Sequence, residues 1–200
     1  MTCEQVPLDQ LRHFVRQSNA IEGYGALGFF LAERFRDPAV EARYFDGHMA
    51  AARMVAADPR SALRDPRIIH RILYRELGKK AGTYRTTELM RVGERIMPHP
   101  QHVAALMEQW VCAATAPCPC ASDPAEAAGY ALMLHNAFLC IHPFVDGNGR
   151  TARLLLNALR LTYGAPWITI YAGNEAYYAQ LERFEDEVFR PQYADTYPSE

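Results

Sequence analysis

The sequence has little lysine, no long apolar run and no strong net charge. Its 200 residues carry 21 Lys and Arg against 23 Asp and Glu, for a formal net charge of −2. Lys79 and Lys80 are the only lysines. This balance provides no general basic field, so we expect no nucleic-acid partner. No stretch approaches the ~18 apolar residues that a membrane span needs, and no signal peptide is evident, so we expect no membrane partner.

Cysteine is also scarce. The five copies form an odd count with irregular spacing, which argues against a disulfide framework. Cys118 and Cys120 match no zinc-ligand spacing, and Cys140 lies among apolar residues, where a free thiol packs as a small hydrophobe. We therefore expect a reducing compartment, the cytoplasm.

What the sequence does contain is apolar periodicity of the helical kind. Half of the residues are apolar and 22% are charged, as in a globular domain, and no repeat or linker interrupts the chain. Helices are predicted at Leu8–Glu22, Val40–Ala57, Asp65–Gly78, Val103–Ala114, Asp123–Ile141, Arg150–Tyr163 and from Asn174 onward. The segment Trp167–Tyr171 has no evident partner strand, so we expect it to be extended or a loop. The fold class predicted is mostly α, as one domain.

The most specific stretch is His142-Pro143-Phe144-Val145-Asp146-Gly147-Asn148-Gly149-Arg150-Thr151-Ala152-Arg153. Pro143, Gly147 and Gly149 prevent regular structure before Arg150, after which strong helix formers follow. The start of a helix leaves N–H groups unpaired, and Arg150 and Arg153 add two cations to that first turn. A bound phosphate would balance this charge, and glycines let phosphate oxygens approach the backbone.

The other polar side chains of this stretch suit chemistry on a phosphate. Asp146 is a candidate Mg²⁺ ligand, because Mg²⁺ is commonly held by one or two carboxylates plus substrate phosphates. His142 is a candidate base, since a histidine is largely neutral at pH 7 and can accept a proton. Phe144 is expected to be an apolar plug. Together these residues indicate phosphoryl or nucleotidyl transfer.

This stretch resembles the signature of the Fic family, His-x-Phe-x-(Asp/Glu)-Gly-Asn-Gly-Arg-x-x-Arg, and every specified position matches. The resemblance implies a Fic domain over residues 25–190, built as a helical bundle with a small β-hairpin flap, preceded by an inhibitory helix at 1–24 and followed by a tail at 191–200. It also implies transfer of AMP from ATP to a Ser, Thr or Tyr hydroxyl of a target protein. His142 would be the base and Asp146 would hold Mg²⁺. The nucleotide phosphates would be bound by Gly147, Asn148, Gly149, Arg150 and Arg153.

The segment Ser18-Asn19-Ala20-Ile21-Glu22-Gly23 is similar to the (Ser/Thr)-x-x-x-Glu-(Gly/Asn) inhibitory motif of some Fic proteins. By helical spacing, Glu22 shares a face with Leu11, Phe14, Val15 and Ser18. The resemblance implies that Glu22 pairs with Arg153 and keeps this arginine from the γ-phosphate. The alternative is a frayed helix end with Glu22 in water.

Two further regions receive roles through the resemblance. Residues 82–93 are the one region with β character, and Gly82, Tyr84 and Arg85 agree with a segment that precedes the flap of Fic proteins. Val92 and Gly93 would then dock an extended stretch of the target by strand addition, whereas the alternative is a surface loop. On the last helix, Tyr177 and Tyr178 either border the adenine or pack in the core.

Several readings remain open. The same site suits another nucleotide as donor, or removal of AMP from a modified target. A non-enzymatic alternative is a nucleotide-sensing regulatory module, although such a module would need the arginines and not the base His142. The resemblance also allows self-modification and a homodimer.

Overall fold

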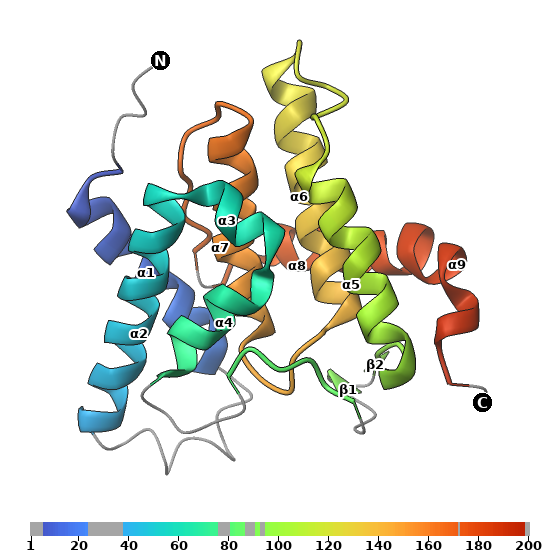
Figure 1. Ribbon diagram of the computed structural model, residues 1–200, viewed down its shortest axis with the longest axis horizontal. Coiled ribbons are helices and arrows are strands. Elements are labelled where there is room, and N and C mark those ends of the chain that lie inside the picture. The colour runs from blue at the N-terminus through green and yellow to red at the C-terminus, as the bar shows by residue number, and fades with distance from the viewer. Residues whose placement is uncertain are drawn as a thin grey trace.

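The computed structural model describes residues 6–23, 38–75, 81–86, 91–92, 95–171 and 173–198, with the main chain alone at 22–23, 38–41 and 91–92. Helices make up most of this part of the chain, and a two-stranded antiparallel hairpin is the sheet it contains (Figure 1). The predicted fold class, mostly α with a small β-hairpin, is confirmed. Within the described residues, no helix combines the length and apolar character needed to cross a membrane.

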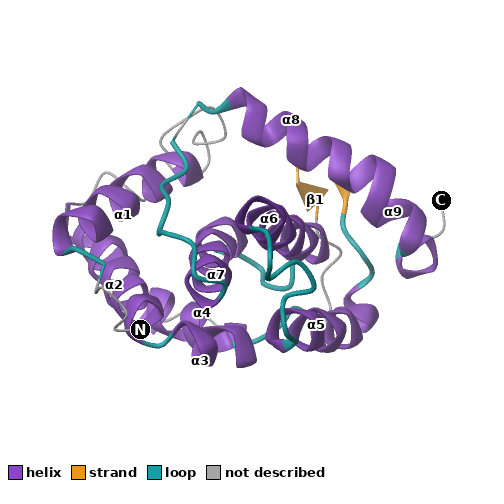
Figure 2. Cartoon of the chain, turned by 90° about the horizontal axis from the view of Figure 1, so that it is seen from above, coloured by secondary structure: helices purple, strands orange, loops and turns teal. Residues whose placement is uncertain are grey.

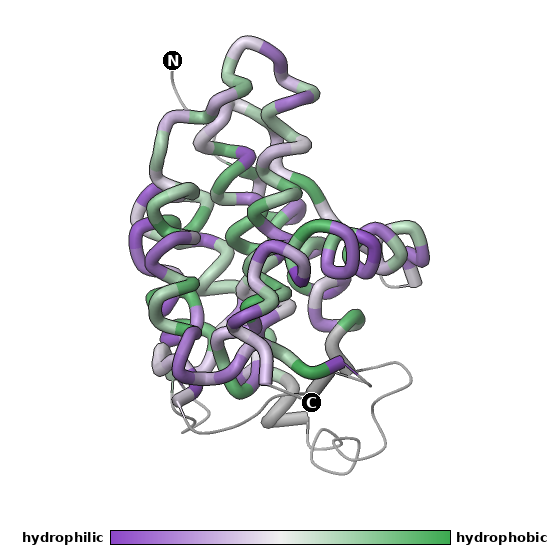
Figure 3. Tube along the Cα trace, turned by 90° about the vertical axis from the view of Figure 1, so that its right-hand side faces the viewer, coloured by the Kyte–Doolittle hydropathy of each residue, from purple (hydrophilic) through white to green (hydrophobic). Residues whose placement is uncertain are grey.

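The elements follow one another with short connections. They are α1 (Leu8–Gly23), α2 (Pro38–Ala57), α3 (Pro59–Arg64), α4 (Pro66–Tyr74), β1 (Arg91–Val92), β2 (Arg95–Ile96), α5 (Pro100–Thr115), α6 (Pro124–Ile141), α7 (Asn148–Thr162), α8 (Glu175–Phe184), a π-helical turn (Glu185–Phe189), α9 (Arg190–Gln192) and a 3₁₀ turn (Ala194–Thr196). Hydrophobic and hydrophilic residues alternate along most of the helices in Figure 3, as amphipathic helices require.

Among the described residues, an aspartate followed by proline caps three helices, α3, α4 and α6. Asp65 and Asp123 cap α4 and α6, where the predicted helices begin; Asp65 accepts from the N–H of Arg67, and Asp123 accepts from those of Ala125 and Glu126. Asp58 caps α3 in the same way, by accepting from the N–H of Ser61 at 3.0 Å. The short α3 lies between the helices predicted at Val40–Ala57 and Asp65–Gly78, and it was not predicted.

Helix α7 lies at the centre of the fold. All residues from Arg150 to Leu159 are buried, and α7 packs against α1, α2, α3, α4 and α6. Figure 2 shows α7 beside α6, with the other helices around them. The predicted inner face of α1 is confirmed, because Leu11, Phe14 and Val15 belong to the same core and Ser18 is buried with them. The chain on both sides of the signature loop is therefore held by packed helices.

The segment after α7 is irregular, as predicted. The side chain of Asn157 in α7 binds both main-chain polar groups of Ile168. Its Oδ1 accepts from the N–H at 2.8 Å, and its Nδ2 donates to the carbonyl at 3.1 Å. Trp167 packs edge-on against Phe14 of α1 with 5.1 Å between the ring centroids. An extended segment can therefore be ordered without a neighbouring strand.

The C-terminal residues pack against the bundle. The carbonyl of Thr196 accepts a hydrogen bond of 2.7 Å from the N–H of His99, just before α5. The guanidinium of Arg190 lies 4.4 Å from the ring centre of Tyr197. The residues expected to be a tail are thus attached to the domain at least as far as Tyr197.

Candidate functional site

His142 sits at the point where α6 ends and the signature loop begins. Its backbone has φ 50° and ψ 59°, and among the described residues it is the one non-glycine with a positive φ. Such a left-handed conformation costs about 1–3 kcal/mol for a residue with a side chain, so neighbouring contacts must hold it. Strain of this kind is found preferentially at active sites, which fits the predicted role of His142.

Arg85 supplies these contacts. Its side chain donates to the carbonyl of His142 at 2.8 Å, to that of Ile141 at 3.2 Å and to that of Pro98 at 2.7 Å. Its own N–H donates to the carbonyl of Pro143 at 2.9 Å. Burial lowers the pKa of Arg85 to about 10, which still leaves it charged at pH 7. Arg85 therefore ties the loop at His142 to the chain that leaves β2.

Phe144 anchors the middle of the loop, as predicted. Its side chain is fully buried and stacks on His70 of α4, with 3.9 Å between the ring centroids and 17° between the planes. His70 Nε2 donates to the carbonyl of Asp146 at 2.9 Å, and its Nδ1 accepts from the N–H of Gly82 at 2.8 Å. Because an amide N–H only donates and a carbonyl only accepts, these bonds select the neutral Nε2–H tautomer. The sequence offered no signal for this role of His70.

Asn148 closes the loop with its side chain. Its Oδ1 accepts from the N–H of Phe144 at 2.9 Å, and its Nδ2 donates to the carbonyl of the same residue at 2.8 Å. The side chain is buried, with both ends of the amide engaged. The role predicted for Asn148 in binding phosphate therefore rests on its main chain in this structure.

Gly147 starts α7 with φ 79°, a conformation that favours glycine. A Cβ placed there would lie 2.5 Å from a ring carbon of Tyr74 and 2.6 Å from its hydroxyl. Glycine is thus required by packing as well as by backbone conformation. A glycine N-cap also has no side chain to accept from the N–H groups of the first turn, which leaves that turn suited to an anion.

The two signature arginines are buried within the first two turns of α7. Arg150 donates to the hydroxyl of Tyr74, and its guanidinium lies 5.1 Å from the ring centre of Tyr44. Arg153 donates from Nε to Ser18 Oγ at 2.8 Å and from a terminal nitrogen to the Ser18 carbonyl at 2.9 Å. Two cations are therefore held at the position predicted for the phosphates.

The expected inhibitory segment lies on the last turns of α1. Ser18 contacts Arg153, and Asn19 Oδ1 accepts from Nδ1 of the buried His48 at 2.8 Å. Burial and the nearby charges of the two signature arginines hold the pKa of His48 well below its usual value, which keeps it neutral. The side chain of Glu22 and residue Gly23 lie outside what the structure describes beyond their main chain in α1. Helical spacing places position 22 one turn after Ser18, on the same face.

Asp146 is the acidic side chain of the loop. Its Oδ1 accepts from the N–H of Gly147 at 2.7 Å and lies 3.7 Å from a guanidinium nitrogen of Arg150, while 41% of the side chain is exposed. The described residues contain no cluster of three or more ligating side chains. One accessible carboxylate nevertheless fits Mg²⁺, which takes its remaining ligands from phosphates and water.

The two tyrosines of α8 have different environments. His135 Nδ1 donates to the carbonyl of Ala152 at 3.0 Å, so its Nε2 accepts from the hydroxyl of Tyr177 at 2.9 Å. Burial lowers the pKa of His135 to about 4 and keeps it neutral. Tyr177 is buried in the core, whereas Tyr178 is 39% exposed. Only Tyr178 is thus placed where it can meet a ligand without rearrangement.

The predicted flap contains the hairpin. Arg91 pairs with Ile96, and Val92 pairs with Arg95. Val92 therefore lies in β1, although its side chain is not described, and Gly93 falls outside the described residues. β1 lies at the end of the region 82–93 that showed β character, whereas residues 82–86 form no strand.

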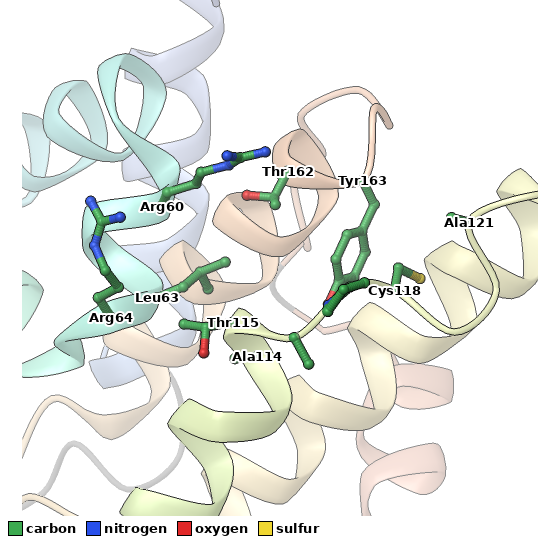
Figure 4. A pocket seen from close by; sticks show the side chains of 11 residues that line it. Arg60, Leu63, Arg64, Ala114, Thr115, Cys118, Ala121, Thr162 and Tyr163 are labelled. Atoms are coloured by element: carbon green, nitrogen blue, oxygen red, sulfur yellow. The ribbon is translucent and has the colours of Figure 1, made fainter.

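A pocket of about 620 Å³ lies at the other end of α7. Figure 4 shows Tyr163 and Arg60 on its walls, with Thr115 below them. Because α7 has 15 residues, this end is about 22 Å from the loop. The pocket is therefore separate from the candidate site.

Comparison with known proteins finds a match to one family over about half of the chain. Residues 62–159 match the Fic/DOC family. The chain is 34% identical over 113 residues to a protein adenylyltransferase Fic of Nematostella vectensis, covering 56% of this chain and 26% of that protein. It is 38% identical over 103 residues to a protein adenylyltransferase fic-1 of Caenorhabditis briggsae, covering 51% and 20%. The match thus spans about a quarter or less of these relatives.

Solved structures show the same fold. Fic-1 from C. elegans superposes with a TM-score of 0.69 at 26% identity, covering 90% of this chain and 57% of that one. A Fic domain containing signaling protein from Bacteroides thetaiotaomicron superposes with a TM-score of 0.67 at 23% identity, covering 90% and 74%.

Proposed function

This chain carries a domain of the Fic/DOC family, and on that premise we propose that it is a protein adenylyltransferase that moves AMP from ATP to a hydroxyl of a target protein. The observation that carries this proposal is the signature loop itself. A strained histidine stands at its entrance, and a glycine-capped helix with two buried arginines stands at its end. A binding module would need the cations but not the histidine.

In the proposed reaction His142 accepts the proton of a Ser, Thr or Tyr hydroxyl. The hydroxyl oxygen forms a bond to the α-phosphorus of ATP, the bond from that phosphorus to the bridging oxygen breaks, and pyrophosphate leaves. The first-turn N–H groups of α7, with Arg150 and Arg153, balance the charge of the phosphates. Asp146 would hold Mg²⁺, which neutralises phosphate charge when bound. Tyr178 is the residue of α8 that could border the adenine.

We further propose that the end of α1 inhibits this reaction. Arg153 is already bonded to Ser18 through a side-chain and a main-chain oxygen. Glu22, one helical turn further, would add a carboxylate and occupy this arginine fully. A state favoured by ~3 kcal/mol through such a pair would reduce activity roughly a hundredfold.

The target would dock by adding a strand to the β1–β2 hairpin. Strand addition uses main-chain hydrogen bonds, so it tolerates different target sequences. Arg85 supports this role, because it joins the loop at His142 to Pro98, two residues after β2. We place the reaction in the cytoplasm. For a test, a second copy of the same chain can serve as the protein that accepts AMP.

The test compares ATP labelled at the α-phosphate with ATP labelled at the γ-phosphate. We expect only the α-label to enter protein, weakly for the wild type and about a hundredfold faster for Glu22→Gly. Adding His142→Ala to Glu22→Gly should abolish transfer while ATP still binds. Incorporation of the γ-label would contradict adenylyl transfer. Equal rates for wild type and Glu22→Gly would contradict the inhibitory role of Glu22 but not adenylyl transfer.

A further inference from the structure

The hairpin is tied to the C-terminal helix through a buried carboxylate that the proposed reaction does not use. Glu185 has a side chain only 5% exposed, and its Oε2 lies 2.5 Å from a guanidinium nitrogen of Arg95 in β2. Its Oε1 lies 3.3 Å from Arg190. Asp186, at the exposed rim, lies 3.6 Å from the other terminal nitrogen of Arg95. We call Glu185, Arg95 and Arg190 the hairpin anchor.

A π-helical turn makes this arrangement possible. The N–H of Arg190 donates to the carbonyl of Glu185, five residues earlier. On a regular α-helix two residues five apart point about 140° away from each other, so their side chains would not meet. The wider π turn brings them closer to one face, and single π turns occur frequently at functional sites.

The anchor holds both the side chain and the main chain of β2. Arg190 donates to the carbonyl of Ile96 at 3.5 Å, while Glu185 holds the side chain of Arg95. A two-stranded hairpin is marginally stable by itself in water, so it needs such attachments. A buried ion pair contributes little net stability compared with apolar packing, and its better-attested use is to select one arrangement.

We propose that Glu185 is a positioning residue for the protein acceptor, because it fixes the strand edge onto which the acceptor adds. This proposal rests on the proposed function. Adding a strand in one register requires an edge of fixed position, since a shift by one residue turns every side chain to the other face. Arg85 fixes the distance between the end of the hairpin and His142, and Glu185 fixes the position of the hairpin itself. Neither the ATP phosphates nor the proton transfer involves Glu185.

The decisive variant is Glu185→Gln, made in the Glu22→Gly chain. The acceptor is a tagged His142→Ala copy of the same chain, and the donor is ATP labelled at the α-phosphate. We expect KM for the acceptor to rise roughly tenfold, because the charged partner of Arg95 is lost. The kcat at saturating acceptor and the Kd for ATP should stay within about twofold. Glu187→Gln is the matched control, since it removes the same charge from an exposed position of the same turn.

A double-mutant cycle sharpens the assignment. Arg95→Gln should raise the same KM, and combining it with Glu185→Gln should add little, because both changes remove one interaction. An unchanged KM in Glu185→Gln would overturn the proposal. A parallel loss of ATP affinity would also overturn it, because Glu185 would then be a general structural residue.

Hydrogen exchange tests the anchor without any need for activity. In the proposed arrangement the amides of residues 91–92 and 95–97 should exchange at least about fivefold faster in Glu185→Gln than in Glu187→Gln, with α6 and α7 unchanged. Unchanged exchange there would overturn the anchor even if transfer is observed. Failure of the Glu22→Gly chain to transfer any label, with the expected exchange difference present, would instead reject the proposed function and the positioning role that depends on it.

Discussion

The loop between α6 and α7 is held differently on its two sides. On the side of α4, three neutral side chains hold the middle of the loop: His70 and Asn148 bond to main-chain atoms, and Phe144 is stacked and buried. On the side of α1, the buried guanidinium of Arg153 bonds to Ser18. A guanidinium can leave one oxygen acceptor for another, including a phosphate oxygen of ATP. The hydrogen bonds of His70 and Asn148 to the main chain have no such alternative partner in ATP. We infer that the first side is a fixed frame and the second a switchable contact.

The largest effect should come from disturbing the fixed frame, with Gly147→Ala. The new Cβ would meet Tyr74 at 2.5 Å and sit on a backbone with φ 79°. We expect the free energy of unfolding to fall by about 2–5 kcal/mol, from overpacking added to the left-handed backbone. We also expect transfer to fall by more than about a hundredfold, since a small displacement of catalytic groups is costly. Urea unfolding and the α-label assay measure the two effects.

Gly164→Ala is the matched control for this change. Gly164 has the same φ of 79°, but a Cβ there has no neighbour within 4 Å. It should lose only about 1–2 kcal/mol, which is the cost of the backbone conformation. Equal losses at the two glycines would show that Tyr74 does not constrain the loop.

Acidification should weaken the core beneath the loop. Burial lowers the folded-state pKa of His135 to about 4, whereas an unfolded histidine has a pKa of about 6.5. Between these pH values the unfolded chain binds more protons, so the free energy of unfolding falls as pH drops, by up to ~3 kcal/mol from this residue. His48 should add to the same slope, because its pKa is also lowered. Urea unfolding at pH 7, 5.5 and 4.5 measures the slope.

His135→Gln should make this pH dependence shallower, at the expense of some stability at pH 7. His13→Gln, which changes an exposed histidine of α1, is the control and should leave the slope as in the wild type. A slope in His135→Gln as steep as that of the wild type would mean that protonation of His135 is not what weakens the core.

On the switchable side, Ser18→Ala should raise activity instead of lowering it. It removes the hydroxyl that accepts from Arg153 Nε but leaves the main-chain carbonyl in place. A hydrogen bond to a charged group is worth about 1.5–3 kcal/mol, so we expect activation of roughly tenfold, less than for Glu22→Gly. Ser61→Ala, at the exposed cap of α3, should leave activity unchanged. A decrease in activity for Ser18→Ala would argue against a switchable contact.

The smallest effects should separate the two tyrosines of α8. Tyr177→Phe removes the hydroxyl donated to His135, so we expect a loss of about 1–3 kcal/mol in stability and little change in KM for ATP. Tyr178→Ala should raise KM for ATP a few-fold with little change in stability, because Tyr178 is exposed. The reverse pattern would place the buried tyrosine, and not the exposed one, at the adenine.

Apolar periodicity and capping residues predicted most of the helices, and the signature predicted where the site lies. The burial of Phe144 was predicted because it is an apolar residue in a polar loop, and the start of α6 was predicted at Asp123. What could not be predicted were buried polar residues with distant partners. His70 binds Asp146, and Glu185 binds Arg95, across long stretches of chain. No local pattern indicates such pairs, because a polar residue on a helix usually faces water.

By itself, the sequence determined the helical architecture, the presence of a loop-to-helix transition and the two arginines at the start of that helix, since these depend on backbone preferences and charge over a few residues. The transition was predicted at Arg150, whereas α7 starts at Asn148 and includes Gly149. Tertiary structure alone decided what each polar side chain of the loop does. It directed the amide of Asn148 to the main chain, separated Tyr177 from Tyr178 and brought Ser18 to Arg153. The physical reason is burial: a polar atom removed from water must find a partner, and folding decides which one is within reach.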